Sequence, residues 1–285
     1  MPELPEVEVV RRGLECHAVG KTLTSVTVSH PRAVRYVEGG SRELEARLRG
    51  RVLSSVYRRG KFLWFVLDDS CALMVHLGMS GQMLIKRTDA HSHPHTRIRC
   101  SLSNEVEQGE LWFVDQRTFG YWRLAELTYA HNRLVPEPMA HIAADLLEPT
   151  QDLMATARLI KSKQVEIKKL LLNQEIVAGI GNIYADEILW SAQIHPRQKA
   201  HRLSLNAIHS LLCEGQKVMN KALLQGGTSF DSLYVNVNGQ SGYFDVSLQA
   251  YGQEGRPCGR CSTAVIREKF TNRSSHLCPR CQRLH

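Results

Sequence analysis

The first residues of the chain place a proline directly beside a carboxylate, in the order Met1-Pro2-Glu3. Removal of Met1 would give Pro2 a free secondary amine, and α-amino groups have a pKa of about 7.7–8.0, so a fraction is neutral and nucleophilic at physiological pH. An amine of this kind can form a Schiff base with a sugar carbon, and Glu3 is placed to move protons. The alternative is an ordinary helix entry, because proline and glutamate are both favoured in a first helical turn.

Four cysteines near the C-terminal end form two Cys-x-x-Cys pairs separated by sixteen residues. Four thiolates from two such pairs can surround one zinc ion tetrahedrally, and bound zinc would explain how a segment with few large apolar side chains folds. A redox pair and disulfides are the alternatives. We expect a structural zinc site, because four thiolates leave the metal no open position for chemistry. Its ligands would be Cys258, Cys261, Cys278 and Cys281.

The other four cysteines, Cys16, Cys71, Cys100 and Cys213, are scattered along the chain. We expect them to be small buried apolar residues.

The chain is basic and carries its positive charge in several places. It has 285 residues, a formal net charge of +8 and a pI of about 9.1, a balance that permits binding to a polyanion without requiring it. Basic clusters at 11–12, 58–61, 161–169 and 267–283 suit a long phosphate track better than a single charged tail. An antiparallel hairpin between the cysteine pairs would present Arg273 to a phosphate, and a solvated basic face is the alternative.

Composition also limits the class and the location of the protein. A hydrophobic fraction of 43% with 22% charged residues is typical of a globular protein. No run of about 18 apolar residues occurs, so we expect no membrane partner, and the first residues lack the pattern of a secretory signal. We expect a cytoplasmic protein, associated with the nucleoid if its partner is DNA.

The hydrophobic pattern changes twice along the chain. Residues 5–16 have helical spacing, whereas short β-branched and aromatic runs between residues 21 and 132 indicate an antiparallel sandwich or barrel. Beyond a linker marked by Pro136, Pro138 and Pro149 the pattern is helical up to about residue 225. The predicted strands are 23–28, 52–57, 62–67, 73–77, 82–86, 97–102, 110–114 and 121–127, with a loop at 88–96; the predicted later helices include 165–172, 183–190 and 205–224.

Three motifs occur in an order that resembles the formamidopyrimidine-DNA glycosylase family. They are Pro-Glu-Leu-Pro-Glu-Val-Glu at 2–8, Gly-Ile-Gly-Asn-Ile-Tyr-Ala-Asp-Glu at 179–187, and the two cysteine pairs. The resemblance covers the full length. It implies an α+β multidomain fold, with an N-terminal antiparallel β-sandwich flanked by helices, a helix–two-turns–helix domain and a C-terminal zinc-finger β-hairpin.

The resemblance also implies domain boundaries and an activity. We expect a catalytic sandwich over 2–133, a linker over 134–150, a DNA-binding helical domain over 151–227, a lesion-capping loop and connector over 228–250, and the zinc finger over 251–285. The family is composed of bifunctional base-excision repair enzymes that release oxidised purines and then cut the strand. We therefore expect a monomer with one structural Zn²⁺ that acts on damaged double-stranded DNA.

Four catalytic residues follow from the resemblance. The processed Pro2 would be the nucleophile that forms the Schiff base, and Glu3 would donate or shuttle protons. Lys61, in Arg-Arg-Gly-Lys-Phe-Leu at 58–63, would act on a phosphate and in β-elimination, although a solvated lysine at a strand end is the alternative. Arg273 would act in δ-elimination. While Met1 is attached, the Pro2 nitrogen is an amide and cannot attack.

Three residues match the family positions that fill the space left when a nucleotide is flipped out of the stack. Met79 would fill the void, Arg117 would face the orphaned cytosine, and Phe119 would wedge between bases. Core packing is the alternative for Met79 and Phe119. The family often has proline at 116 and a basic residue at 118, so Gln116 and Thr118 depart from its pattern and put the geometry of this loop in question.

The remaining predicted DNA contacts are to phosphates. Asn182 matches a phosphate-binding asparagine, and the glycines before it leave helix N–H groups free for an anion. Lys163 or Lys168 would contact the backbone, and Tyr251 matches a phosphate-contacting tyrosine of the family. His93 matches a family histidine that contacts DNA. A glycine turn between helices and a packing tyrosine are the corresponding alternatives.

Two other functions remain open from the sequence. An endonuclease VIII-like enzyme would prefer oxidised pyrimidines, but Leu4 and the loop segment 226–244 favour the purine enzyme. A zinc protein that binds DNA without catalysis would not need Pro2, Glu3, Lys61 and Arg273 together.

Overall fold

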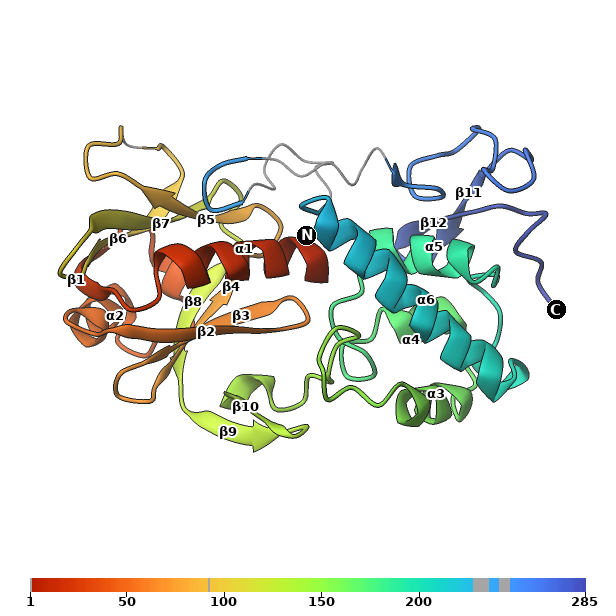
Figure 1. The fold of residues 1–285 in the computed structure, drawn as a ribbon, viewed down its shortest axis with the longest axis horizontal. Coiled ribbons are helices and arrows are strands. Elements are labelled where there is room, and N and C mark those ends of the chain that lie inside the picture. The colour runs from red at the N-terminus through yellow and green to blue at the C-terminus, as the bar shows by residue number, and fades with distance from the viewer. Residues whose placement is uncertain (1, 92, 228–235, 241–246) are drawn as a thin grey trace. The chain divides into compact units, whose positions relative to one another are not determined.

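The computed structural model describes residues 2–91, 93–227, 236–240 and 247–285. The chain forms two compact units, the first made of residues 1–141 and 226–243, the second of 142–225 and 244–285 (Figure 1). The first unit is a β-sandwich with helices, and the second is a group of helices that carries a β-hairpin.

The first unit contains two four-stranded antiparallel sheets, with strand orders β1-β6-β7-β5 and β2-β3-β4-β8. All eight strands predicted from the sequence are present, with ends shifted by one or a few residues. Their bounds are β1 Thr22–Val28, β2 Leu53–Arg59, β3 Phe62–Leu67, β4 Ala72–His76, β5 Gly81–Lys86, β6 Thr96–Ser103, β7 Gln108–Asp115 and β8 Tyr121–Ala125. This result confirms the sandwich and excludes the barrel.

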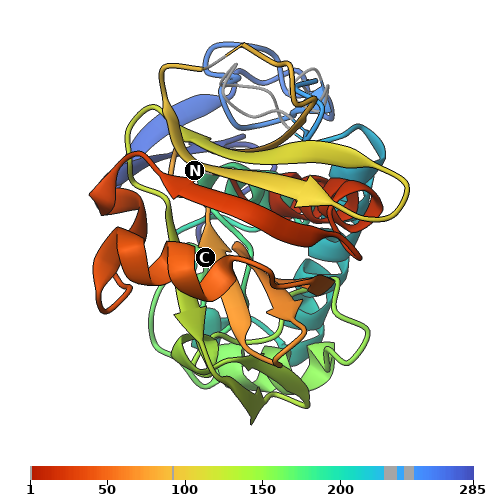
Figure 2. The ribbon, with the colours of Figure 1, turned by 90° about the vertical axis from the view of Figure 1, so that its left-hand side faces the viewer.

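Strand alternation places one apolar face of each sheet in a shared core. In β3, Leu63 and Phe65 belong to this core, whereas Trp64 between them faces the other side. Helix α1, Leu4–His17, adds Val7 and Leu14 to the same core and packs against β2, β3 and β5. Helix α2, Gly40–Leu48, lies against β1 (Figure 2). Each buried side chain of this size stabilises the fold by about 1.5–3 kcal/mol, so α1 is fixed by its own packing.

A hairpin that the sequence analysis did not predict follows the sandwich. Strands β9, Leu127–Ala130, and β10, Arg133–Pro136, pair across a two-residue turn. His131 and Asn132 in this turn have φ of 49° and 60°, the left-handed geometry that matches the twist of a tight hairpin. A 3₁₀ helix, Glu137–Met139, comes next, so regular structure continues into the residues expected to form a linker.

The second unit is built on helices α3, Leu153–Lys161, α4, Ile167–Leu171, α5, Asn182–Ser191, and α6, Leu205–Leu224. The last three match segments named from the sequence, whereas α3, which begins at the N-cap Asp152, lies in the stretch predicted to be helical but was not given as a separate helix. Helix α6 packs against α3 and α5, and it ends before Gly226, whose φ of 77° suits a helix stop. Strands β11, Ile266–Phe270, and β12, Arg273–Leu277, form the expected antiparallel hairpin, and β12 packs on α5.

The scattered cysteines are not uniformly buried. Cys100 is in the core, as expected, and burial raises the pKa of its thiol. Cys71 and Cys213 are half-buried and Cys16 is exposed, so the prediction was wrong for Cys16, which lies on the solvent side of α1. None of the helices in the described residues has both the length and the apolar character that crossing a bilayer requires.

Candidate active site and nucleic-acid interface

Pro2 and Glu3 lie at the N-terminal end of α1, and both are buried. Glu3 is the N-cap of the helix, and its backbone N–H donates to the Glu6 carboxylate at 2.9 Å in a reciprocal capping box. The partial positive charge of a helix N-terminus stabilises these carboxylates. The helix-entry interpretation is therefore correct as a description of structure, and it also fixes a carboxylate beside the Pro2 backbone.

Lys61 lies in the two-residue turn between β2 and β3, after Gly60, whose φ is 55°. The lysine is only 7% exposed, so the alternative of a solvated lysine at a strand end is wrong. Arg58 donates to the Gly60 carbonyl at 3.1 Å and to the Glu8 carboxylate at 3.0 Å, which ties this turn to α1. Lys61 is thus held by a braced turn.

Glu8 is the acidic partner of that brace. Burial raises the pKa of Glu8, but hydrogen bonds and charge from Arg11 and Arg58 outweigh burial and lower the pKa to about 2. The carboxylate is therefore ionised at all physiological pH values, and the ion pair that orients the Lys61 turn persists.

His76, at the end of β4, is a residue of this site that sequence reasoning did not single out. It pairs in register with Phe62, next to Lys61, and its ring stacks on Tyr121 with centroids 5.2 Å apart. Burial, followed by the charges of Arg35 and Lys61, lowers the pKa of His76 to about 4. The ring is therefore neutral at pH 7. In the sequence, the one feature that pointed to His76 was its position three residues before Met79.

Met79, Arg117 and Phe119 come from two loops of the first unit and are exposed together. Met79 is 39% and Phe119 42% exposed, so neither is a core residue as the alternative required. The Arg117 guanidinium lies 4.0 Å from the Met79 sulfur. Exposed apolar side chains beside a cation fit contact with stacked bases better than packing within the sandwich.

A buried aspartate supports this cluster. Asp115, with no exposed area, accepts hydrogen bonds from the Ser80 hydroxyl, from the Arg117 N–H at 3.2 Å and from the Gly120 N–H at 2.7 Å. Between these residues Thr118 has a φ of 55°, a left-handed conformation that is uncommon for a β-branched residue. The loop keeps a defined geometry although Gln116 and Thr118 depart from the family pattern.

His93 lies in the loop before β6, where the sequence predicted a loop. Its ring is exposed and accepts a hydrogen bond from the His95 N–H at 3.2 Å. Partial burial and the neighbouring His95, Lys86 and Arg97 lower its pKa. The side chain is accessible to a ligand.

The expected capping loop is only partly described, because 228–235 and 241–246 lie outside the described residues. Within 236–240, Val237 is buried and its carbonyl accepts a hydrogen bond from the Ile85 N–H at 2.8 Å. A Cβ at Gly13 would lie 2.4 Å from a Val237 methyl, so this glycine allows Val237 to pack on α1. The described part of the segment is therefore anchored to α1 and β5.

In the second unit, Asn182 is the first residue of α5 and follows Gly181 in extended geometry. Its side-chain nitrogen donates to the Ser274 carbonyl at 3.0 Å, and its side-chain oxygen is buried without a hydrogen-bond partner in the described residues. Gly179, with a φ of 91°, forms the turn before the helix. Asn182 thus connects the helix N-terminus to the hairpin.

Arg273 begins β12 at the turn of the hairpin, and its side chain is exposed. Asp186 on α5 holds the same strand, since it accepts from the Ser275 hydroxyl at 3.0 Å and from the His276 N–H at 2.9 Å. The strand residue Arg273 and the helix residue Asn182 are therefore fixed on one scaffold.

The structure distinguishes between the two lysines proposed to contact DNA. Lys168 is fully buried, pairs with Asp186 at 2.6 Å and donates to the Ser274 carbonyl at 3.0 Å. The suggestion that Lys168 contacts a DNA backbone is therefore wrong, because its ammonium group is enclosed between α5 and the hairpin. Lys163 is exposed beyond the end of α3.

Tyr251 is half-buried beside the hairpin, with its ring in an edge contact to His276 at 4.9 Å. Its backbone N–H donates to the buried Glu187 carboxylate at 2.9 Å, as do those of Gln249 and Ala250 at 3.0 and 2.8 Å. Burial raises the pKa of Glu187, and these hydrogen bonds oppose the increase. Glu187 therefore fixes the backbone that presents Tyr251.

The four clustered cysteines fit a zinc ion. The sulfur atoms of Cys258, Cys261, Cys278 and Cys281 all lie within 4.8 Å of one another. Cys261 is 3.5 Å from both Cys278 and Cys281, and zinc–thiolate bonds of about 2.3 Å in a tetrahedron would place sulfurs about 3.8 Å apart. One structural zinc is therefore consistent with the geometry, and it would link the loop before β11 to the end of β12.

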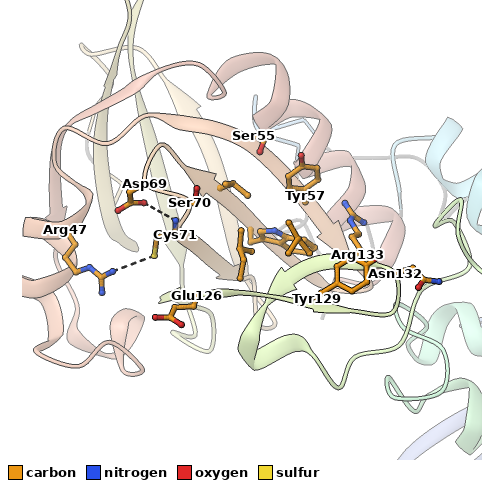
Figure 3. A pocket seen from close by; sticks show the side chains of 14 residues that line it. Arg47, Ser55, Tyr57, Asp69, Ser70, Cys71, Glu126, Tyr129, Asn132 and Arg133 are labelled. Carbon is orange, nitrogen blue, oxygen red and sulfur yellow. Dashed lines mark hydrogen bonds between the residues drawn. The ribbon is translucent and has the colours of Figure 1, made fainter.

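A separate cavity of about 930 Å³ lies between β2, β3 and the β9–β10 hairpin (Figure 3). Tyr57, Trp64 and Tyr129 line it, and the Arg133 guanidinium lies 5.1 and 5.4 Å from the Tyr57 and Trp64 rings. None of the predicted catalytic or DNA-contact residues lines this cavity.

Comparison with known proteins agrees with this arrangement. Residues 1–122 match the formamidopyrimidine-DNA glycosylase N-terminal domain, 142–233 the H2TH domain of the same enzymes, and 255–284 the zinc finger found in FPG and IleRS. The formamidopyrimidine-DNA glycosylases of Corynebacterium diphtheriae and Rhodococcus jostii are 60% and 56% identical to the chain; the matches cover 100% and 99% of it, and 100% and 96% of those proteins.

Solved structures agree as well. A Lactococcus lactis FPG mutant bound to Fapy-dG-containing DNA is similar with a TM-score of 0.86 and 32% identity, over 99% of this chain and 100% of that chain. A MutM complex with carbocyclic 8-oxo-G-containing DNA has a TM-score of 0.84 and 33% identity, over 99% and 100%. The full-length identity, the three matching domains and the buried N-terminal carboxylate lead to one conclusion: the chain belongs to the formamidopyrimidine-DNA glycosylase family.

Proposed function

We propose that this chain is a bifunctional DNA glycosylase and abasic-site lyase that removes 8-oxoguanine and formamidopyrimidines from double-stranded DNA. The observation that carries the proposal is the buried Pro2-Glu3 pair at the capped start of α1, in a chain 60% identical to the formamidopyrimidine-DNA glycosylase of Corynebacterium diphtheriae. The glycosylase function in base excision repair follows from the family, and the roles of individual residues are the proposal.

The first step uses the N-terminal amine. After removal of Met1, the Pro2 nitrogen attacks C1′ of the damaged nucleotide, the glycosidic bond breaks, and the base leaves with a proton. Opening of the sugar ring, with protonation of its oxygen, gives an iminium ion between Pro2 and C1′. Glu3 is the proton shuttle in this step, since it is the buried carboxylate next to Pro2.

Two eliminations follow from the iminium ion. In the first, a base takes a C2′ proton, the C2′–C3′ double bond forms, and the bond from C3′ to its phosphate oxygen breaks. In the second, loss of the C4′ proton forms the C4′–C5′ double bond and breaks the C5′–oxygen bond. Lys61 assists the first step and Arg273 the second, each by neutralising the phosphate that leaves. The products are a one-nucleotide gap with phosphate ends and the sugar remnant, which hydrolysis releases from Pro2.

DNA recognition is divided between phosphate and base contacts. Asn182, Arg273, Lys163 and Tyr251 in the second unit, with His93 in the first, bind phosphates. Met79, Arg117 and Phe119 occupy the stack that the flipped nucleotide leaves. The exposure of all three side chains, held by the buried Asp115, supports this assignment.

The same proposal includes the organisation of the chain. We propose a catalytic sandwich at 2–133, a linker at 134–150, a helix–two-turns–helix domain at 151–227, a capping loop and connector at 228–250 and the zinc finger at 251–285. We also propose a monomer that acts on nucleoid DNA in the cytoplasm. The matched ranges 1–122, 142–233 and 255–284 support the first part.

Borohydride reduction tests the chemistry. Reduction of a reaction with 8-oxoguanine DNA should trap a covalent adduct through Pro2. A Pro2→Gly protein would still have an N-terminal amine, so undiminished trapping in it would not reject the mechanism. Absence of any adduct with the processed wild-type protein, under conditions in which the base is released, would reject it.

A comparison with a solved structure supports oxidised pyrimidines as a second substrate class. A similar solved structure is the wild-type Lactococcus lactis FPG bound to DNA that contains an oxidised pyrimidine. A substrate panel decides the ranking for this chain. Preference for thymine glycol over 8-oxoguanine opposite cytosine would replace the purine assignment with the endonuclease VIII-like one.

A further inference from the structure

Arg35 grips the backbone of the loop that carries Phe119. Arg35 directly follows the 3₁₀ helix Pro31–Val34, and more than eighty residues of sequence separate it from the loop that it contacts. One terminal nitrogen donates to the Gly120 carbonyl at 3.0 Å and the other to the Phe119 carbonyl at 2.9 Å. Two consecutive carbonyls are thus bound by one guanidinium, which is a two-point attachment.

An aromatic frame orients this guanidinium. Its central carbon lies 4.9 Å from the Tyr36 ring centre and 4.7 Å from the Tyr121 ring centre, and the two tyrosines meet edge to face at 4.7 Å. A planar guanidinium stacks on aromatic rings and donates in a fixed fork, whereas a lysine ammonium is a single flexible point. The site therefore requires arginine geometry as well as positive charge.

The loop that Arg35 grips is strained. Thr118 occupies the left-handed region at φ 55°, and such strain persists only where the surrounding structure over-determines it. Asp115 holds the Gly120 N–H at 2.7 Å, and Arg35 holds the carbonyl of the same residue. Gly120 is therefore fixed from both sides, immediately after the residue that projects outward.

Phe119 itself has a second cationic neighbour. The Arg32 guanidinium lies 5.8 Å from the centre of the Phe119 ring. A wedge that separates stacked bases must resist being pushed back, because unstacking costs a few kcal/mol for each base step. Loss of Arg35 would remove the donors to the Phe119 and Gly120 carbonyls and leave the Asp115 hydrogen bonds to hold the strained Thr118 turn.

We propose that Arg35 is a positioning residue for lesion search, which holds Phe119 and the adjacent Arg117 in the geometry that enters the base stack. The inference rests on the proposed function, because it assigns Arg35 to the loop that replaces a flipped nucleotide. Arg35 acts before base removal and has no part in the chemistry at Pro2. Its loss therefore affects the opening of the duplex more than the steps on a sugar that has already lost its base.

The test compares Arg35→Met, Arg35→Lys and the control Arg42→Met. Arg42 is an exposed arginine of α2, so its replacement removes the same charge from the same unit. Stopped-flow fluorescence of 2-aminopurine next to 8-oxoguanine reports base unstacking, and single-turnover base release gives the excision rate. Borohydride trapping with preformed abasic-site DNA isolates the later chemistry.

We expect Arg35→Met to slow unstacking and excision about fivefold, the effect of losing one to two partly exposed hydrogen bonds. Trapping on abasic-site DNA should change less than twofold, and Arg42→Met should match the wild type. Arg35→Lys should resemble Arg35→Met. Full rates in Arg35→Lys would show that charge alone matters and would overturn the proposal, as would equal losses on both DNA substrates.

A second variant covers the case in which Arg35→Met does not fold. Tyr36 is 52% exposed, and Tyr36→Leu removes one wall of the frame without removing the guanidinium. It should slow unstacking two- to threefold with unchanged trapping, and wild-type unstacking would contradict the proposal. Failure of the wild type to form any adduct would refute the proposed function instead, so the two failures are distinguishable.

Discussion

Replacement of Asp186 by asparagine tests how the zinc-finger hairpin is fixed to the helices of the second unit. The Asp186 carboxylate is 1% exposed and accepts from Lys168 at 2.6 Å, from the Ser275 hydroxyl at 3.0 Å and from the His276 N–H at 2.9 Å. Asparagine keeps the shape but removes the negative charge that faces the fully buried Lys168 ammonium. Breaking a buried ion pair from one side costs about 3–5 kcal/mol.

The assay follows zinc retention and unfolding together. Release of zinc to a coloured chelator across a urea series gives the stability of the finger, and thermal unfolding gives that of the chain. Glu254→Gln is the matched control, because the Glu254 side chain is 58% exposed and its ion pair with the exposed Arg267 is long, at 3.9 Å. We expect the control to stay within about 0.5 kcal/mol of the wild type.

A double variant separates the ion pair from its parts. Replacing both partners, in Lys168→Met with Asp186→Asn, removes both buried charges, so its cost should be smaller than the sum of the single variants. The Asp186→Asn variant should also bind DNA less tightly, because it loosens strand β12. The Ser274 carbonyl on that strand accepts a hydrogen bond from the Asn182 side chain at 3.0 Å. A destabilisation below about 1 kcal/mol with normal zinc retention would refute this explanation.

Three further predictions concern separate residues. Burial and nearby positive charges lower the pKa of His76 to about 4, so as pH falls this residue takes up a proton in the unfolded state before it does in the folded state. The free energy of unfolding should therefore decrease as pH decreases from about 6.5 to 4. An NMR titration of His76 with a midpoint above pH 6 would contradict this prediction. Cys258→Ser should lose zinc and weaken DNA binding in a filter-binding assay, and a variant that retains one equivalent of metal would argue against the four-thiolate site. Gly120→Ala should cost about 1–3 kcal/mol and slow excision, because its Cβ would lie 2.6 Å from the His76 carbonyl oxygen. Gly109→Ala is the comparison: its Cβ would lie 3.3 Å from the Lys86 carbonyl oxygen, so it should lower the melting temperature less, and an equal loss in both variants would contradict the prediction.

Strand and helix positions were largely predictable because period-two and helical patterns are local. The β9–β10 hairpin was missed, although its turn carries Asn132 in left-handed geometry, because His131-Asn132 lacks the glycine that usually marks such a turn. Helix α3 was not delimited within the stretch predicted to be helical, yet its N-cap signal was present, since the Asp152 carboxylate accepts from the Ala155 N–H at 2.9 Å. For both elements the local sequence held a signal for the turn or the helix start, but the signal was weak.

Burial of charged residues was not predictable in the same way. Lys168 appears as one of several lysines in a basic segment, but its partner Asp186 is 18 residues away and Ser275 is 107 residues away. Lys61 was open to interpretation as a solvated lysine, and only the packing of its turn shows that it is buried. Arg35 gave no pattern of its own, and His76 had only its place in the segment that leads to Met79, because the roles of both residues depend on loops brought together by the sandwich.

The central claim is that the free amine of Pro2 is the nucleophile, and the state of the N-terminus tests it most directly. Two preparations should be compared, one with Pro2 exposed and one with an extra residue retained before it, each verified by intact mass. Both are reacted with 8-oxoguanine DNA under borohydride. The structure and the family predict a covalent adduct and strand cleavage only for the protein with the free Pro2 amine. Full lyase activity and adduct formation in the blocked protein would contradict the claim.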